Sequence, residues 1–140
     1  MAIRFPSVEF FQALQQRTKD EKARFEKLGY CDTTFGVRIG KDLFTIAFEV
    51  YECVHVHEGG DPERLDFVLT GPPAVWNEMI AAIVKGKGAD GLHTLNTLSH
   101  VGDVLRVESV DAEGNDKFYR YMASLQEFFD QAQHLDVKLS

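Results

Sequence analysis

Two histidines in the segment HVHE have the spacing best suited to metal chemistry. His55 and His57 are two residues apart, so in an extended strand both imidazoles project from the same face. A zinc or iron ion would need further ligands from nearby acidic or thiol side chains. The same face and the turn after it offer Glu49, Cys53, Glu58 and Glu63. Because their spacing departs from the HxH-then-Glu pattern of cupins, we predict solvated or structural histidines and keep a metal site as an alternative.

Carboxylates could supply a general base if an apolar pocket raised the pKa of one of them. The candidates are Asp66, Asp103 and Asp111. Asp66 stands between Leu65 and Phe67, so strand alternation directs its carboxylate away from their apolar face. We therefore predict no catalytic residue. Structural roles are also predicted for the three remaining histidines, His93, His100 and His134.

The glycine-rich segment KGKGADG, residues 85–91, does not have the form of a phosphate-binding loop. Such a loop precedes a helix and ends in Lys-Ser or Lys-Thr, because the first backbone N–H groups of the helix bind the phosphate. This segment follows a helical pattern and lacks that ending. It is therefore predicted to be a linker, and no cofactor is predicted.

Length and charge limit the class of protein. The 140 residues are predicted to form one domain, 1–140, and the formal net charge of −7 disfavours nucleic acid and anionic membranes, which need a cationic surface. The longest apolar stretch is too short to span a bilayer, so no stable membrane insertion is predicted. With no secretory signal and no CxxC pair, we predict a cytoplasmic protein without a disulfide framework. Nothing in the sequence indicates an oligomeric state.

The segment LFTIAFEVYECVHVH, residues 43–57, is the element around which the other elements are predicted to pack. Read with a period of two, one of its faces is apolar. That face carries Phe44, Ile46, Phe48, Val50, Val54 and Val56, interrupted by Glu52. At about 3.3 Å per residue a straight strand would run roughly 45 Å, so we expect one long half-buried strand with a bend or bulge near Glu52.

An opening helix is predicted from Ser7, a suitable N-cap, to Gly29, a suitable residue just past the C-terminus. Its apolar positions are Phe11, Leu14, Thr18, Phe25 and Leu28. The middle turns, RTKDEKAR, are polar on all sides and are expected to be solvated. Short strands are predicted at 35–39 and 65–70, and together with 43–57 they would form a three-stranded meander.

A second helix is predicted to begin at Pro73. Its apolar stripe consists of Val75, Trp76, Met79, Ile80, Ile83 and Val84. The segment 92–98 has leucines three residues apart, which fits a helical turn or a strand, and periodicity does not decide between them. A strand at 104–110 should end in the turn-rich DAEGND, and Asp116 should cap the last helix. The inner face of that helix carries Phe118, Tyr121, Met122, Leu125, Phe128, Phe129 and Ala132.

Together these elements predict an α+β fold, in which helices cover one face of a five-stranded, mostly antiparallel sheet. The expected order is α-β-β-β-α-β-β-α. Apolar side chains at such spacing usually form an ordinary close-packed core. Adaptable methionines at 79 and 122, and the polar tips of Trp76 and Tyr121, would also suit a pocket.

The order of elements resembles the sterol carrier protein family over about residues 8–132. The patterns that carry the resemblance are an amphipathic helix before a meander, the strand-to-helix segment LDFVLTGPPAVWNEMIAAIVKGKG, and Gly102-Asp103 before a final helix containing YMASLQEFF. The segment LHTLNTLSHVGD departs from the phenylalanine-glycine-lysine-like stretch of the family, and DAEGND is longer than expected. The family has no catalytic signature, and the resemblance implies an apolar tunnel for an acyl chain, a sterol or a similar molecule.

The function implied by this resemblance is that of a non-enzymatic carrier for a hydrophobic small molecule. The predicted lining residues are Phe48, Val50, Trp76, Met79, Ile80, Ile83, Leu95, Leu98, Tyr121, Met122, Leu125 and Phe129. Two alternatives stay open. One is a small enzyme that acts on a steroid-like substrate through an aspartate, and the other is a metal-binding domain that uses His55 and His57.

Overall fold

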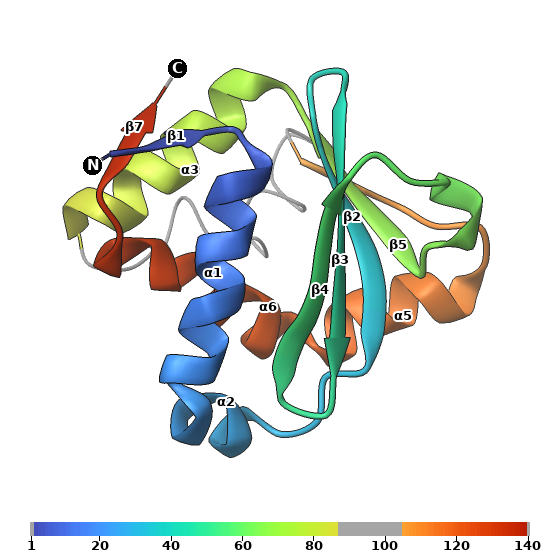
Figure 1. Ribbon diagram of the computed structural model, residues 1–140. Coiled ribbons are helices and arrows are strands. Elements are labelled where there is room, and N and C mark those ends of the chain that lie inside the picture. Colours follow the sequence, from blue (N-terminus) through green and yellow to red (C-terminus); the bar gives the residue numbers. More distant parts are fainter. Residues whose placement is uncertain (1, 87–104, 140) are drawn as a thin grey trace.

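The computed structural model describes residues 2–86 and 105–139 (Figure 1). It has an α+β fold, as predicted, with helices packed on a five-stranded sheet. The strands are β1 (Ile3–Phe5), β2 (Thr33–Ile39), β3 (Asp42–Glu49), β4 (Glu52–Glu58), β5 (Phe67–Gly71), β6 (Arg106–Glu108) and β7 (Val137–Leu139). The helices are α1 (Val8–Asp20), α2 (Lys22–Leu28), α3 (Pro73–Gly86), α5 (Ala112–Arg120) and α6 (Met122–Asp130), with short 3-10 helices η1 (Pro62–Arg64) and η2 (Gln131–His134). The leucine-rich segment 92–98 lies outside the described residues.

The strand order in the main sheet is β4-β3-β2-β5-β6. Strands β2, β3 and β4 form an antiparallel meander, but β5 lies parallel to β2, with Phe35 opposite Phe67. The expectation that segment 65–70 would continue the meander is therefore wrong. Both β2 and β5 are mostly buried, and such strands belong in the middle of a sheet. Strand β4 exposes several side chains and lies at the sheet edge.

The predicted single strand 43–57 is a hairpin. It reverses at Val50, whose φ of 59° lies in the left-handed region, and β4 returns alongside β3. The register shifts between Ala47 and Phe48, so Cys53 turns inward and Val54 turns outward, opposite to their predicted faces. A straight strand of that length would have extended well beyond the seven residues of β2, leaving backbone groups unpaired, whereas the hairpin pairs them.

The opening helix begins and ends as predicted but is divided in the middle. The Ser7 hydroxyl accepts a hydrogen bond from the Phe10 N–H, and Gly29 has φ of 90°. At Glu21 the backbone leaves the helical region, which separates α1 from α2. Most of the middle is solvated as expected, because Lys19, Asp20, Lys22, Ala23 and Arg24 are exposed. Thr18, predicted on the inner face, is fully buried there, and its hydroxyl accepts a hydrogen bond from the backbone N–H of Cys53. Leu28, expected on the inner face, is exposed.

The last helix also differs from its prediction. It begins in DAEGND, which is therefore not a turn, and Asp111 rather than Asp116 caps α5. Asp116 instead pairs with Arg120 one turn further along. The helix breaks at Tyr121, where φ is −104° and ψ is 11°, and continues as α6.

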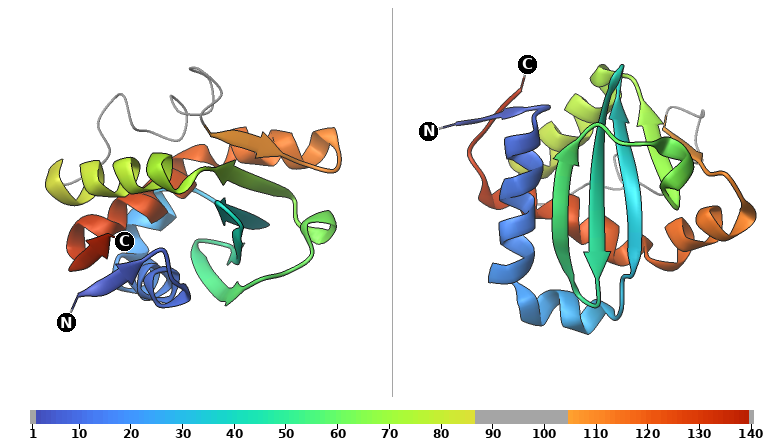
Figure 2. Two further views of the ribbon diagram at one scale, coloured as in Figure 1. Left: turned by 90° about the horizontal axis from the view of Figure 1, so that it is seen from above. Right: turned by 45° about the vertical axis from the view of Figure 1, so that its right-hand side comes forward.

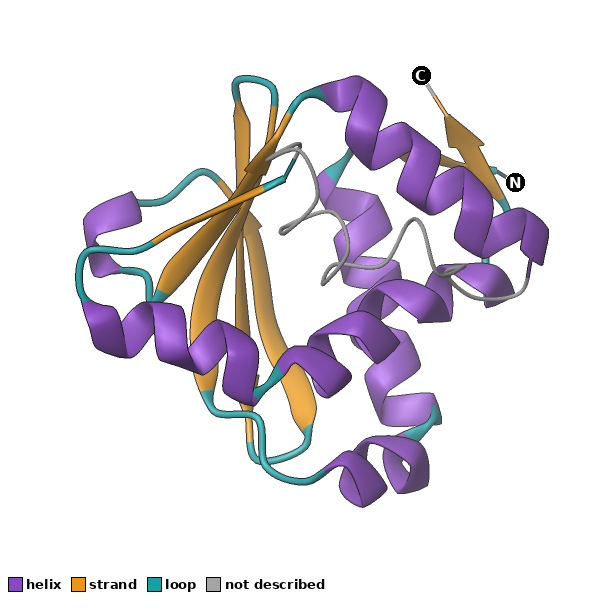
Figure 3. Cartoon of the chain, turned by 180° about the vertical axis from the view of Figure 1, so that it is seen from behind, coloured by secondary structure: helices purple, strands orange, loops and turns teal. Residues whose placement is uncertain are grey.

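The helices lie together on one face of the sheet. In the view from above, α1, α3 and α6 share one side of the sheet and η1 lies beyond the other (Figure 2). Seen from behind, α6 crosses between α3 and α1 (Figure 3). Strands β1 and β7 pair in parallel and bring the two ends of the chain side by side. The core therefore lies between the sheet and these helices.

Candidate ligand-binding interior

The interior between the sheet and the helices is built from aromatic rings. On the sheet, Phe35 stacks on Phe67 of the neighbouring strand at 5.2 Å and lies 6.3 Å from Phe48. On the helices, Phe128 meets Phe48 edge to face at 5.2 Å, and Phe129 lies 5.6 Å from Phe128. Strand alternation directs one set of rings toward the helices, and the helical repeat directs the other toward the sheet. The result is an extensive apolar surface.

Most predicted lining residues come together in this interior. Those that are buried are Phe48, Trp76, Met79, Ile80, Ile83, Leu125 and Phe129. Tyr121 and Met122, at the break between α5 and α6, are half-buried and pack against the same cluster. Val50 does not lie with Phe48, because it is 46% exposed on the β3–β4 turn. Leu95 and Leu98 lie outside the described residues.

The buried members of this set fill space against one another. Trp76 lies 5.6 Å from Phe129, and its indole N–H donates to the carbonyl of Arg38, so its polar atom is satisfied inside the fold. A ligand in this part of the interior would have to displace side chains that now touch. Two surface hollows lie nearby: one of about 580 Å³ beside β1 and α1, and an apolar groove of about 250 Å³ between α3 and β7.

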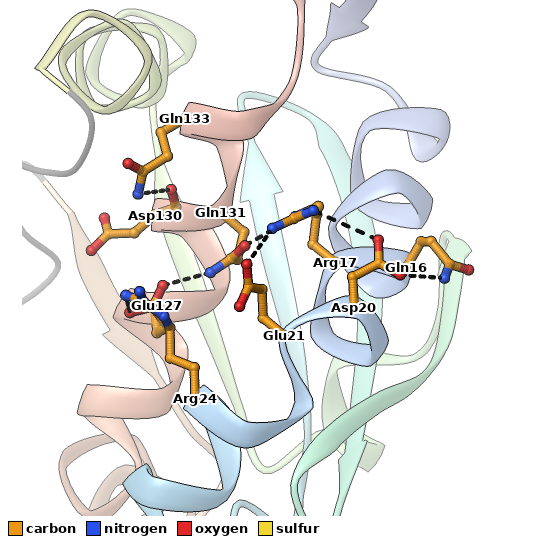
Figure 4. A network of polar contacts seen from close by, with 9 residues as sticks. All are labelled: Gln16, Arg17, Asp20, Glu21, Arg24, Glu127, Asp130, Gln131 and Gln133. Atoms are coloured by element: carbon orange, nitrogen blue, oxygen red, sulfur yellow. Dashed lines mark hydrogen bonds and ion pairs between the residues drawn. The ribbon is translucent and has the colours of Figure 1, made fainter.

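A polar network that was missed in the sequence analysis joins the first helical pair to the last (Figure 4). Arg17 donates to the side-chain oxygen of Gln131 at 3.1 Å and to Glu21 at 2.8 Å. Gln131, almost fully buried, donates to Glu127 at 2.7 Å, and Glu127 also pairs with Arg24. The mixed charges of RTKDEKAR indicated that ion pairs could form, but the partners from the last helix, Glu127 and Gln131, lie more than a hundred residues further along the chain. The network holds α1 and α2 against α6 and fixes one wall of the interior.

The carboxylate of Asp66, a candidate base, is occupied by structural partners. It accepts hydrogen bonds from the hydroxyl of Thr33 at 2.7 Å and the N–H of Thr34 at 3.1 Å. Its other oxygen lies 3.3 Å from the ammonium group of Lys117. These contacts tie the start of β5 to β2 and to α5. Asp111 caps a helix, and Asp103 lies outside the described residues.

The histidine pair lies on the outer face of the edge strand, as the spacing predicts. Nε2 of His55 is 2.8 Å from Nδ1 of His57, a hydrogen-bond distance in which one ring donates to the other. Cys53 is buried on the opposite face and is not available to that pair. Over residues 2–86 and 105–139 no group of three or more histidine, cysteine or acidic side chains is placed to hold a metal ion.

We expect neither cysteine to react while the protein is folded. Burial raises the pKa of the Cys31 and Cys53 thiols from 9.0 to about 12, and the reactive thiolate is therefore scarce at neutral pH. The thiol reagent DTNB at pH 8 should label no cysteine in the native protein and both in denaturant. Because the unfolded thiols ionise first, stability should fall as pH rises from 9 toward 12. Rapid labelling of the native chain would show that the region around these residues opens.

The fold defined by this sheet and these helices is one already seen in a solved structure. The chain is similar to the crystal structure of sterol carrier protein 2, with a TM-score of 0.68 over 92% of this chain and 97% of that one. Sequence identity is 11%, so the similarity is one of fold. Neither a protein-family model nor a curated protein sequence matches the chain. Among the described helices, none is both long and apolar enough to cross a membrane.

Proposed function

We propose that this protein binds and carries a hydrophobic small molecule, such as a fatty acyl chain or a sterol, between the sheet and helices α3 and α6. The observation that carries the proposal is the sterol-carrier-like fold, which extends over nearly the whole chain. The aromatic and aliphatic lining of the interior supports it, because an acyl chain needs contact area and no ionic partner. Burying ten methylenes is worth about 8 kcal/mol before ordering costs, at roughly 0.8 kcal/mol each.

The lining also has the adaptability that a carrier needs. Met79 is fully buried on α3, and Met122 lies at the break between the last two helices. Methionine has three rotatable bonds and can repack around guests of different shape. The break at Tyr121 leaves α6 as a separate nine-residue unit, which can shift without bending a longer helix. A guest would enter by moving α6 away from Phe48.

The cysteines and the net charge bear on where the protein works and which partners it does not bind. Two buried free cysteines suit a reducing compartment, so we infer a cytoplasmic location. The net charge of −7 supports a protein that does not bind nucleic acid.

Ligand binding is tested by titrating the freshly purified, delipidated protein with the fluorescent fatty acid cis-parinaric acid, after mass spectrometry of the extracted lipid. Ile80→Trp places a large ring in the interior and should weaken binding at least tenfold. Because overpacking a filled core costs about 1–3 kcal/mol, its thermal unfolding is measured alongside, and binding is compared at a temperature where the variant is fully folded. Val110→Trp adds the same ring at an exposed position and should bind like the wild type. If the wild type takes up no fatty acid or sterol, or if Ile80→Trp binds as well, the proposal is wrong.

A further inference from the structure

An exposed apolar patch lies at the end of the molecule where α2 meets the β3–β4 turn, at the bottom of Figure 1. It consists of Leu28, Tyr30, Val50, Tyr51 and Val54, and we call it the tyrosine patch. Four of these side chains are between 40% and 63% exposed, and Tyr51 is half-buried. They account for most of the large hydrophobic side chains that the described chain exposes. Clustered exposure of this kind marks an interaction surface.

The centre of the tyrosine patch is a valine held in a strained backbone conformation at the β3–β4 turn. Val50 has φ of 59°, which is unfavourable for a β-branched residue and would be easy for glycine. Its N–H donates to the carboxylate of Asp32 at 2.8 Å, and its carbonyl accepts from the N–H of Cys31 at 2.7 Å. These bonds fix the turn while the valine side chain projects into solvent. Residues of this kind concentrate at functional sites.

The charge beside the patch favours a cationic partner. A hollow of about 350 Å³ beside the patch is bordered by Glu26, Glu49 and Glu52, and its one lysine, Lys22, is already paired with Glu26 at 3.8 Å. Glu49 and Glu52 stand directly opposite each other on the two strands, an arrangement that is destabilising for like charges. A cation between them would remove that repulsion.

We propose that the tyrosine patch binds a basic, partly apolar peptide segment of another protein. An arginine of the segment would lie between Glu49 and Glu52 and against the ring of Tyr51, which stacks on Tyr30 at 5.2 Å. Neighbouring aliphatic side chains of the segment would cover Val50 and Val54. A second copy of this chain fits less well, because two acidic rims would meet and each chain carries a net charge of −7.

The test is fluorescence anisotropy of the full chain with a labelled hexapeptide of alternating arginine and leucine, at 50 and 500 mM NaCl. A matched peptide with glutamate in place of arginine should not bind. Glu49→Gln/Glu52→Gln should weaken binding at least tenfold, whereas Glu9→Gln/Glu63→Gln, with the same change in charge away from the patch, should stay within twofold of wild type. Equal losses in both double variants, or no binding by the wild type, would overturn the proposal.

Val50→Gly separates binding from stability. Glycine relieves the left-handed backbone, so the midpoint of thermal unfolding should stay the same or rise, while peptide binding weakens at least threefold. A lower midpoint would mean that the valine serves the fold, and the proposal would fail. Binding to phosphatidylcholine vesicles that Val50→Gly abolishes would assign the patch to a membrane instead. If the wild type dimerises in sedimentation velocity and Val50→Gly does not, the patch would be an interface between two copies of this chain instead.

Discussion

Replacing Phe129 by alanine should lower the free energy of unfolding by about 3–5 kcal/mol, the usual cost of truncating a fully buried aromatic side chain. Phe129 is fully buried on α6, and its ring is 5.6 Å from Trp76 on α3 and 6.3 Å from Phe11 on α1. Three helices therefore converge on one side chain. Its removal would leave a cavity that no single helix can close without losing contact with the other two.

The measurement is urea denaturation followed by circular dichroism, with the slope checked for two-state behaviour. Val110→Ala, which truncates a 66% exposed side chain, is the control and should change stability by less than about 0.5 kcal/mol. A loss below about 1 kcal/mol for Phe129→Ala would show that the helix junction is loosely packed. A loose junction would in turn favour an interior with room for a guest.

Gly114→Ala should be strongly destabilising although it replaces a single hydrogen by a methyl group, with a loss of about 3 kcal/mol. An added Cβ would lie 1.7 Å from the backbone carbonyl oxygen of Asp66, which cannot rotate away. Relief requires α5 to move off β5, and that movement strains the cap from Asp111 to the Gly114 N–H and the contact between Lys117 and Asp66. Alanine is ordinarily better than glycine in a helix, so a large loss would come from this contact alone.

Gly86 provides a matched control for that substitution. It also lies in a helix, and an added Cβ there meets nothing within 4 Å. Gly86→Ala should therefore be neutral or stabilising by up to about 1 kcal/mol. Thermal unfolding of the two variants beside the wild type checks the prediction. Similar midpoints for Gly114→Ala and wild type would contradict the close approach of α5 to β5.

Local features of this fold follow from the sequence alone. The Ser7 cap, the glycine at 29, the strand pattern of 35–39 and the apolar stripe of α3 were all predicted, and each depends on residues within a few positions of one another. The order of these elements was sufficient to indicate a sterol-carrier-like α+β fold. Most residues of the interior could be predicted as well, because the repeats of 2.0 residues in strands and 3.6 residues in helices indicate which side chains share a face.

Tertiary structure decided the features that depend on distant partners. The alternation of apolar and polar residues is the same in one long strand and in a hairpin, so it does not distinguish between them. The chain folds back at Val50 because β2 is too short to pair with all of 43–57, and the hairpin pairs the remaining backbone groups. The parallel pairing of β5 with β2 depends on which strands are buried on both faces. Arg17 was predicted to be solvated, but the folded chain brings Gln131 from near its C-terminal end into hydrogen-bond contact with it. Periodicity indicates which face of an element is buried. Which other element covers that face depends on the free energy of the whole folded chain.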